Sequence, residues 1–293
     1  MTRGPAVAKG YPLVTCSRTQ CIEPGADGFP RRLDGVRPAI RKLHVSGTIT
    51  DLQPAVAIVG SRAASAAALQ VARALGRRVA ERGGVVVSGG ALGVDTAAHL
   101  GALEGGGPTT VVLGTGLDII YPERNAGLFA AIVERGGALV SMFPMGATVR
   151  RGMFLRRNQL IAALADVTVV VAAAHTSGSL HTARHAVALG RGLAAVPGTP
   201  ATDALVRAGA AIVEVVADLD RLLDGDPRGD ERAPLEGDLA RAWEALDPER
   251  GRDAGDVARA LGVGIPRALS LLDDLHATGW ILALPGSAYV RAP

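Results

Sequence analysis

Four arginines surround one aromatic residue in the segment from Thr148 to Asn158, which is called the basic segment below. It reads TVRRGMFLRRN, with arginines at positions 150, 151, 156 and 157 around Phe154. Guanidinium groups pair with phosphates, and an aromatic face can stack on a nucleobase. Because stacking on a side chain needs an unpaired base, this combination favours single-stranded over duplex nucleic acid.

Three further turns have the composition of anion sites: Gly60-Ser61-Arg62, Ser88-Gly89-Gly90 and Ser177-Gly178-Ser179. Free main-chain amides at a helix start bind anions, and glycine lets a phosphate approach the main chain closely. Arg62 adds a charged fork to the first turn. Each turn taken alone is equally typical of a capped helix start, so the prediction rests on their combination.

Two residue pairs that contain histidine are better explained by structure than by chemistry. Asp95 and His99 stand one helical turn apart, and we expect them to pair on one helix face. His181 and His185 have metal-ligand spacing, but neither an H-E-x-x-H pattern nor a nearby carboxylate accompanies them. We therefore predict no catalytic residue, no metal site and no cofactor.

Composition limits the class of protein. The 293 residues carry a net charge of only +3, so the distribution of charge matters more than its total. Cys16 and Cys21 are too far apart for a C-x-x-C motif and lack a second pair to complete a zinc site. No signal peptide is apparent, and Asp166 interrupts the most apolar window, 160–174. We expect a cytoplasmic protein with no membrane partner.

Short apolar runs alternate with helical patterns from residue 55 to residue 196. The runs are 55–59, 85–87, 110–113, 138–140, 167–171 and 193–196, with helices expected near 65–82, 94–104, 123–135, 155–164 and 177–189. Near-continuous apolar strands between helices predict an α/β fold, a Rossmann-like doubly wound and mostly parallel sheet. Right-handed crossovers then bring the basic segment and the three turns to one edge of that sheet.

The chain divides into four predicted parts. Residues 1–50 read as an irregular segment with a short helix near 29–33, residues 51–223 as the Rossmann-like DNA-binding domain, and residues 224–234 as a linker. Three helical patterns and a hairpin over 235–293 predict a small winged-helix domain. This domain holds six arginines and nine acidic residues, a balance of −3, which favours contact with protein over DNA.

Six short motifs make this chain resemble the DNA-processing protein A family, also called Smf, because they occur in the order and with the spacing found in that family. They are VAIVGSR (56–62), VSG with DTAAH (87–89, 95–99), VLGTGLD with YP (112–118, 121–122), FLRRN (154–158), SGSL with TAR (177–180, 182–184) and VPG (196–198). The chain departs from the pattern at Leu92, where the family usually has a basic residue, and at Met142 and Ala172, where it tends to have acidic ones.

The resemblance implies a single-stranded DNA-binding recombination mediator that is not an enzyme. It implies that the protein helps to load the RecA recombinase on incoming DNA during natural transformation, and that it forms a homodimer through the Rossmann-like domain. The DNA-binding residues expected from the motifs and the resemblance are Gly60, Ser61, Arg62, Ser88, Gly89, Gly90, Arg151, Phe154, Arg156, Arg157, Asn158, Ser177, Gly178 and Ser179.

Two alternatives stay open at this point. The rim of the sheet suits a nucleotide-binding sensor, and Rossmann-like relatives include nucleotide phosphoribohydrolases. Those enzymes carry a P-G-G-x-G-T-x-x-E segment with a catalytic glutamate, whereas this chain has Val196-Pro-Gly-Thr-Pro200.

Overall fold

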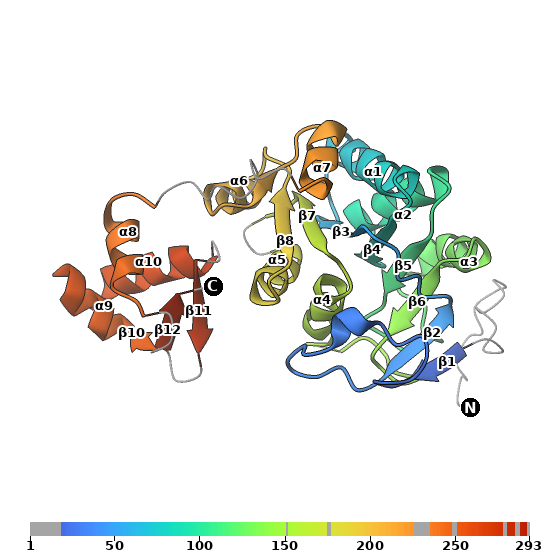
Figure 1. Ribbon diagram of the computed structural model, residues 1–293, viewed down its shortest axis with the longest axis horizontal. Helices are drawn as coiled ribbons and strands as arrows, with labels where there is room; N and C mark the ends of the chain where they lie inside the picture. Colours follow the sequence, from blue (N-terminus) through green and yellow to red (C-terminus); the bar gives the residue numbers. More distant parts are fainter. Residues whose placement is uncertain are drawn as a thin grey trace, which may run out of the picture.

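The structure, a computed structural model, describes residues 19–150, 152–174, 177–225, 235–247, 251–277, 280–284 and 288–291. A large α/β domain comes first, and a smaller unit follows from residue 235 (Figure 1). Of the predicted linker, residues 226–234 lie outside the described residues.

A nine-stranded sheet forms the centre of the large domain, in the order β1-β2-β6-β5-β4-β3-β7-β8-β9. The strands are β1 (Thr19–Ile22), β2 (Leu43–Gly47), β3 (Ala55–Gly60), β4 (Val85–Gly89), β5 (Thr109–Val112), β6 (Ala138–Ser141), β7 (Val167–Ala172), β8 (Gly192–Ala195) and β9 (Ala211–Ile212). From β6 across to β9 neighbouring strands are parallel, while β2 is antiparallel to β6 and β1 to β2. This is the predicted doubly wound, mostly parallel sheet.

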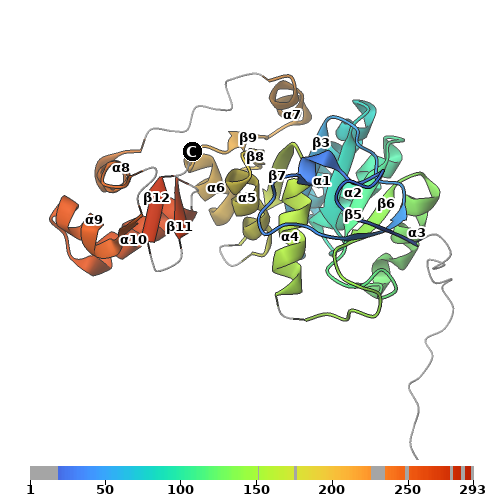
Figure 2. The same cartoon turned by 60° about the horizontal axis from the view of Figure 1, so that its bottom comes forward.

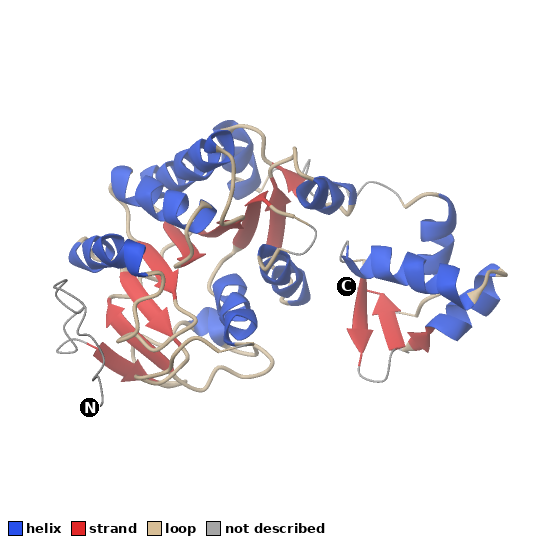
Figure 3. Cartoon of the chain, turned by 180° about the vertical axis from the view of Figure 1, so that it is seen from behind, coloured by secondary structure: helices blue, strands red, loops and turns tan. Residues whose placement is uncertain are grey.

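Helices cover both faces of the sheet (Figure 3). One face carries α1 (Ala66–Glu81), α2 (Val94–Glu104), α3 (Ala126–Glu134) and α7 (Val216–Leu223), and the other carries α4 (Met153–Ala163), α5 (Ser179–Ala188) and α6 (Pro200–Arg207). Strand β3 shows why both faces are covered. Its Val56 and Ile58 pack with the α1 and α2 side, and its Ala57 and Val59 with the α4 side, because successive side chains alternate.

The start of the domain differs from the sequence prediction. Residues 19–50 are not irregular, because β1 and β2 extend the main sheet and Leu43 and Val45 are buried in its core. A 3-10 turn at Arg31–Leu33 matches the short helix expected there. At the opposite edge, α6, β9 and α7 add a further unit that the sequence did not reveal.

The smaller unit has its own core and its own sheet, in the order β10-β12-β11 (Figures 1 and 2). Its elements are α8 (Gly237–Glu244), β10 (Arg252–Asp253), α9 (Ala254–Leu261), α10 (Ile265–Ala277), β11 (Ile281–Leu284) and β12 (Ala288–Arg291). Three helices and two hairpin strands lie where the sequence predicts them, and the assignment to the winged-helix class stays a prediction. Among the described residues, no helix combines the length and apolarity that crossing a membrane requires.

A candidate nucleic-acid interface at the carboxyl ends of the strands

The order of the strands reverses at β3. From this central strand the chain adds β4, β5 and β6 on one side, and then β7, β8 and β9 on the other. Loops that leave β3 and β7 therefore diverge at their carboxyl ends, which is where open α/β sheets bind ligands. The Gly60-Ser61-Arg62 turn follows β3 and the Ser177–Ser179 turn follows β7, so both flank this reversal.

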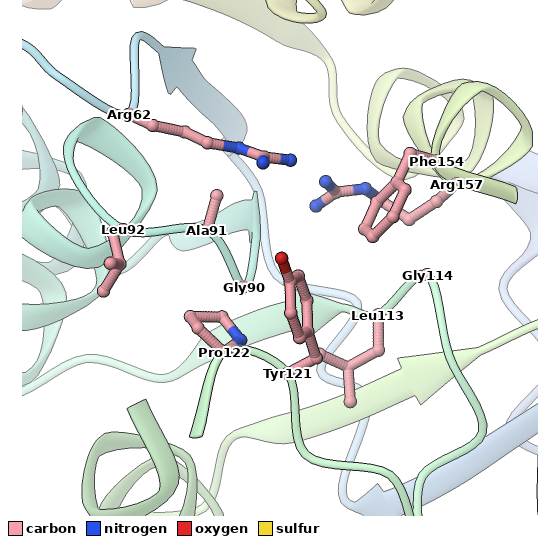
Figure 4. Close-up of a pocket in the computed structure, with 10 residues that line it drawn as sticks. All are labelled: Arg62, Gly90, Ala91, Leu92, Leu113, Gly114, Tyr121, Pro122, Phe154 and Arg157. Carbon is pink, nitrogen blue, oxygen red and sulfur yellow. The ribbon is translucent and has the colours of Figure 1, made fainter. Parts of the chain in front are cut away.

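Two adjoining cavities open at this edge. The first has a volume of about 120 Å³ and is mostly apolar, with Leu92, Leu113, Tyr121 and Pro122 in its wall (Figure 4). The second has a volume of about 350 Å³ and is more polar, and it adds Ser61, Asp95, Asn158, Ser177 and Ser179. Four residues line both cavities: Arg62, Ala91, Phe154 and Arg157. An apolar space beside a polar one suits a ligand with an aromatic base and an anionic group.

Phe154 stands between the two cavities, in the first turn of α4. The Cζ atoms of Arg62 and Arg157 lie 5.8 and 5.6 Å from the centre of its ring, within cation–π range. The Tyr121 ring centre is 6.2 Å away, with its hydroxyl turned toward the space between the two arginines (Figure 4). A Cβ atom on Gly114 would lie 2.8 Å from Cδ1 of Phe154, so the glycine leaves room for the ring.

Arg157 reaches the cavities from a buried position. Its Nη1 donates to the carbonyl oxygen of Val112 at 3.3 Å and lies 3.9 Å from Oδ2 of Asp95. Its Nε is buried without a hydrogen-bond partner among the described residues. Burial lowers the pKa of the Arg157 guanidinium, and it raises the pKa of the Asp95 carboxyl. A buried cation this loosely paired has donor capacity left for an anion.

Arg62 approaches the same ring from the exposed side. Within the described part of the chain it forms no ion pair with a carboxylate. Its positive charge further lowers the pKa of Arg157, a sign that the two guanidinium groups repel each other across the cleft. An anion placed between them removes this repulsion.

The Ser177–Ser179 turn forms the opposite wall of the polar cavity. Nδ2 of Asn158 donates to the carbonyl oxygen of Gly178 at 2.9 Å, which ties α4 to the start of α5. The hydroxyls of Ser177 and Ser179 lie 2.7 Å apart and hydrogen-bond to each other. Asn158 therefore braces this turn, and the N-terminus of α5 faces the cavity beside Arg157.

Several predicted contact residues serve internal packing in this structure. The hydroxyl of Ser88 is buried and donates to the carbonyl oxygen of Ile58 at 2.6 Å. A Cβ atom on Gly90 would lie 2.7 Å from Cζ of Phe129, and one on Gly60 would lie 2.8 Å from Cγ2 of Val94. These glycines make room for side chains from inside the domain, and they also remain in the cavity walls, Gly90 in the apolar cavity and Gly60, with Ser61, in the polar one.

The basic segment is only partly gathered at the cavities. Arg156 is exposed on α4 and lines neither cavity, and Arg150 is also exposed. The predicted contact Arg151 lies outside the described residues. The chain before the segment is fixed by the loop after β5, because both carboxylate oxygens of Asp118 accept from the Gly146 amide at 2.8 Å.

Sequence reasoning also missed or misplaced some residues. Tyr121 and Leu92 line the apolar cavity but were not among the predicted contacts, although the Tyr-Pro pair was a signal. The expected pairing of His99 with Asp95 is wrong. His99 instead makes hydrogen bonds through Nδ1 with the Thr109 hydroxyl at 2.7 Å and through Nε2 with the Gly89 carbonyl oxygen at 2.9 Å. Burial lowers the pKa of His99 to about 4, so it is neutral at pH 7.

Comparison with known proteins gives a consistent result. The chain is 37% identical over 291 residues to Protein Smf of Escherichia coli, covering 92% of this chain and 76% of that protein. It is 41% identical over 264 residues to a putative DNA processing protein DprA of Mycobacterium tuberculosis, covering 85% of this chain. It spans 64% of the length of that mycobacterial relative.

Solved structures and the family match agree with these relatives. The structure of DNA processing protein A from Helicobacter pylori superposes with a TM-score of 0.64 at 30% identity, over 71% of this chain and 97% of that one. That structure describes a single-stranded DNA binding mode of the Helicobacter protein. Residues 20–224 of this chain match the DNA recombination-mediator protein A family. The chain therefore belongs to the DNA recombination-mediator protein A family, whose members include the DprA and Smf proteins.

Proposed function

We propose that this chain binds single-stranded DNA at the carboxyl-end edge of its sheet and acts without catalysing a reaction. The observation that carries the proposal is the position of Phe154, with the guanidinium groups of Arg62 and Arg157 within 6 Å of its ring centre at the junction of two cavities. An unpaired base stacks on such a ring, and the neighbouring cations neutralise its phosphates.

The contacts divide between the two cavities. The apolar cavity with Leu92 and Tyr121 receives the base, and the polar cavity with the Ser177–Ser179 turn receives the phosphate. Arg156 and Arg150 lie outside both cavities. There they extend the positive surface that faces the backbone of the bound DNA. Ser88 and Gly89 line neither cavity and contribute by holding this geometry, whereas Gly60 and Gly90 line the cavities and leave room for the ligand.

The lining of the cavities supports a binding role over an enzymatic one. Asp95 is the only carboxylate that lines either cavity among the described residues, and it faces Arg157. Hydrolysis of a nucleotide by general acid–base chemistry needs a positioned acid and base, and a lone buried carboxylate beside a cation does not supply both. Release of a free base from nucleoside monophosphates would contradict this part of the proposal.

Family membership supports the remaining roles. We place the chain in the loading of the RecA recombinase on incoming DNA, with a homodimer through the Rossmann-like domain and a winged-helix C-terminal unit that contacts protein. Sedimentation at raised salt tests the dimer. The rate at which RecA assembles on single-stranded DNA, with and without this chain, tests the loading role.

Fluorescence anisotropy with a labelled oligothymidine tests the central proposal. We expect tight binding at low salt, weaker binding as salt rises, and much weaker binding to a duplex of equal length. A duplex bound as tightly as the single strand, or no binding at low salt, would overturn it.

A further inference from the structure

Asn125 stands at the N-cap of α3, but its side chain does not cap the helix. An asparagine in this place usually accepts a hydrogen bond from an amide of the first helical turn, and here no such bond forms. The residue is only 4% exposed, and its side chain bonds to residues 35 and 29 positions earlier in the chain. Asn125 therefore gives up the local role of an N-cap for contacts with a distant loop.

Two hydrogen bonds from Nδ2 of Asn125 join the loop before α3 to the loop after β4. One bond goes to the carbonyl oxygen of Gly90 and the other to Oγ1 of Thr96, both at 2.9 Å. The Thr96 hydroxyl in turn donates to the carbonyl oxygen of Ala91 at 2.8 Å. Asn125 and Thr96 thus form one connected set of hydrogen bonds, which is called the amide bridge below.

The amide bridge connects two parts of the wall of the apolar cavity. These parts are Gly90, Ala91 and Leu92 from the loop after β4, and Tyr121 and Pro122 from the loop before α3 (Figure 4). The main-chain amide of Asn125 donates to the carbonyl oxygen of Pro122 at 3.0 Å, which closes the turn that carries Tyr121. The bridge therefore fixes the spacing between the two loops.

The amide bridge also keeps this wall apolar. A carbonyl oxygen left free in such a cavity must be satisfied by water or by a donor on the ligand. Because the carbonyl oxygens of Gly90 and Ala91 are already engaged by Asn125 and Thr96, the loop presents an apolar surface to a base. Asn125 itself lines neither cavity, so it acts on the ligand only through these loops.

We propose that Asn125 is a positioning residue for base binding, which acts by holding Tyr121 and Gly90 at the spacing that admits a base to the apolar cavity. This role rests on the proposed DNA-binding function. The phosphate-binding groups Arg62 and Arg157 come from the loop after β3 and from α4, outside the two bridged loops. Loss of the bridge should therefore weaken the contacts with the base and preserve those with the phosphate.

Two labelled strands of equal length separate the base from the phosphate. One is oligothymidine, and the other has the same phosphodiester backbone but no bases. The unaltered full chain should bind oligothymidine more tightly, and the ratio of the two affinities, measured by fluorescence anisotropy, gives the contribution of the bases.

In Asn125→Ala the affinity for oligothymidine should fall about tenfold, which is the effect of losing one stacked base. The affinity for the strand without bases and its dependence on salt should stay unchanged, because the phosphate contacts remain. A purely structural role of Asn125 would weaken the binding of both strands alike, so the ratio of affinities distinguishes the two roles.

Gln159→Ala is the matched control. Gln159 is also buried, its Nε2 donates to the carbonyl oxygen of Arg37 at 2.6 Å, and it lines neither cavity. This variant should keep the ratio of affinities even if its melting temperature falls as far as that of Asn125→Ala. Thr96→Val removes the other member of the bridge and should lower the ratio. The two bridge changes combined should lower it by less than the product of their separate effects, because they act on one network.

The possible results separate this role from the proposed function. An Asn125→Ala chain that keeps the full ratio, or that loses affinity for both strands equally, would overturn the role of Asn125 and leave single-stranded DNA binding in place. A Gln159→Ala chain with the same loss of ratio would also overturn it. Equal affinities of the unaltered chain for the two strands would refute base binding in the apolar cavity, and both proposals would then fall together.

Discussion

The guanidinium group of Arg157 occupies the space that a side chain on Gly89 would fill. A Cβ atom on Gly89 would overlap Nη1 of Arg157, lie 2.6 Å from its Cζ, and lie 2.5 Å from Oδ2 of Asp95. The missing side chain at the end of β4 is thus the reason why a cation can stand beneath Phe154.

Gly89→Ala should therefore expel Arg157 from its buried position. We expect at least a tenfold loss of affinity for oligothymidine and a lower melting temperature, because the main chain on one side and the carboxylate on the other leave no room to relax. Gly127→Ala is the matched control, since nothing lies within 4 Å of a Cβ at that position. Equal affinities for the two variants would refute this role of Gly89.

Removing the ring at the junction of the cavities should weaken binding without unfolding the protein. Stacking contributes about 1–3 kcal/mol per base, so Phe154→Ala should cost about 10-fold or more in affinity. The neighbouring exposed residue gives the control Leu155→Ala, for which we expect little change in oligothymidine binding. Fluorescence anisotropy at fixed salt measures both, and a retained affinity in Phe154→Ala would exclude stacking there.

The repulsion between Arg62 and Arg157 leads to opposite effects on stability and binding. Arg62→Ala should weaken DNA binding and reduce the slope of log affinity against log salt by about 0.7, the value for one phosphate contact on a single strand. The free protein should melt at the same or a higher temperature, because one of two converging cations is gone. A clear fall in the melting temperature would show that Arg62 stabilises the fold instead.

Leu92 lines the apolar cavity and adds no charge to its wall. Leu92→Lys should raise the affinity for oligothymidine, because a cation is added to the cavity wall. The slope of log affinity against log salt should become steeper by about 0.7. Leu100→Lys adds the same charge to an exposed position on α2 and should change neither quantity as much. If both lysines act alike, the gain comes from net charge rather than from the site.

The lowered pKa of His99 leads us to expect that the folded protein loses stability in acid. Its pKa falls from 6.5 to about 4 in the folded protein, so the unfolded chain binds the proton first as pH drops. Stability is full above about pH 6.5 and declines toward pH 4, by about 3 kcal/mol in total. Denaturant unfolding at several pH values measures this decline.

The raised pKa of Asp95 acts in the opposite direction, so the comparison must be made against a variant. His99→Gln keeps a donor toward the Gly89 carbonyl oxygen and removes the titrating ring. Its stability should fall less steeply than that of the native chain between pH 6.5 and 4. Parallel curves would assign the acid sensitivity to other groups.

The sheet was predictable where its strands are continuous apolar runs. Residues 55–59 and 85–87 are buried because both faces of the sheet are covered. A strand covered on both faces needs apolar residues at every position, so the apolar run in the sequence is enough to predict it. Strands β1 and β2 were not predicted because both carry polar residues such as Gln20 and His44, and because β1 lies at the edge of the sheet. Their place in the sheet depends on pairing with β6, which is distant in sequence.

The site was predictable in outline for a different reason. Topology brings the ends of parallel strands together, so the convergence of Arg62, Phe154 and the Ser177–Ser179 turn follows from their positions after strands and at helix starts. The sequence could not predict which glycines face a ligand and which make room for a neighbouring side chain. Whether Gly89 faces a ligand or a neighbouring side chain depends on which atoms fill its missing Cβ, and that is set by packing across the whole domain.

The reversal of strand order at β3 has a consequence for how this protein diversifies. The walls of the cleft come from separate loops after β3, β4, β5 and β7 and from α4. A single exchange in one wall can therefore retune what the cleft holds without a second change elsewhere to preserve folding. Such independence lets descendants of one ancestor acquire new ligands on an inherited scaffold.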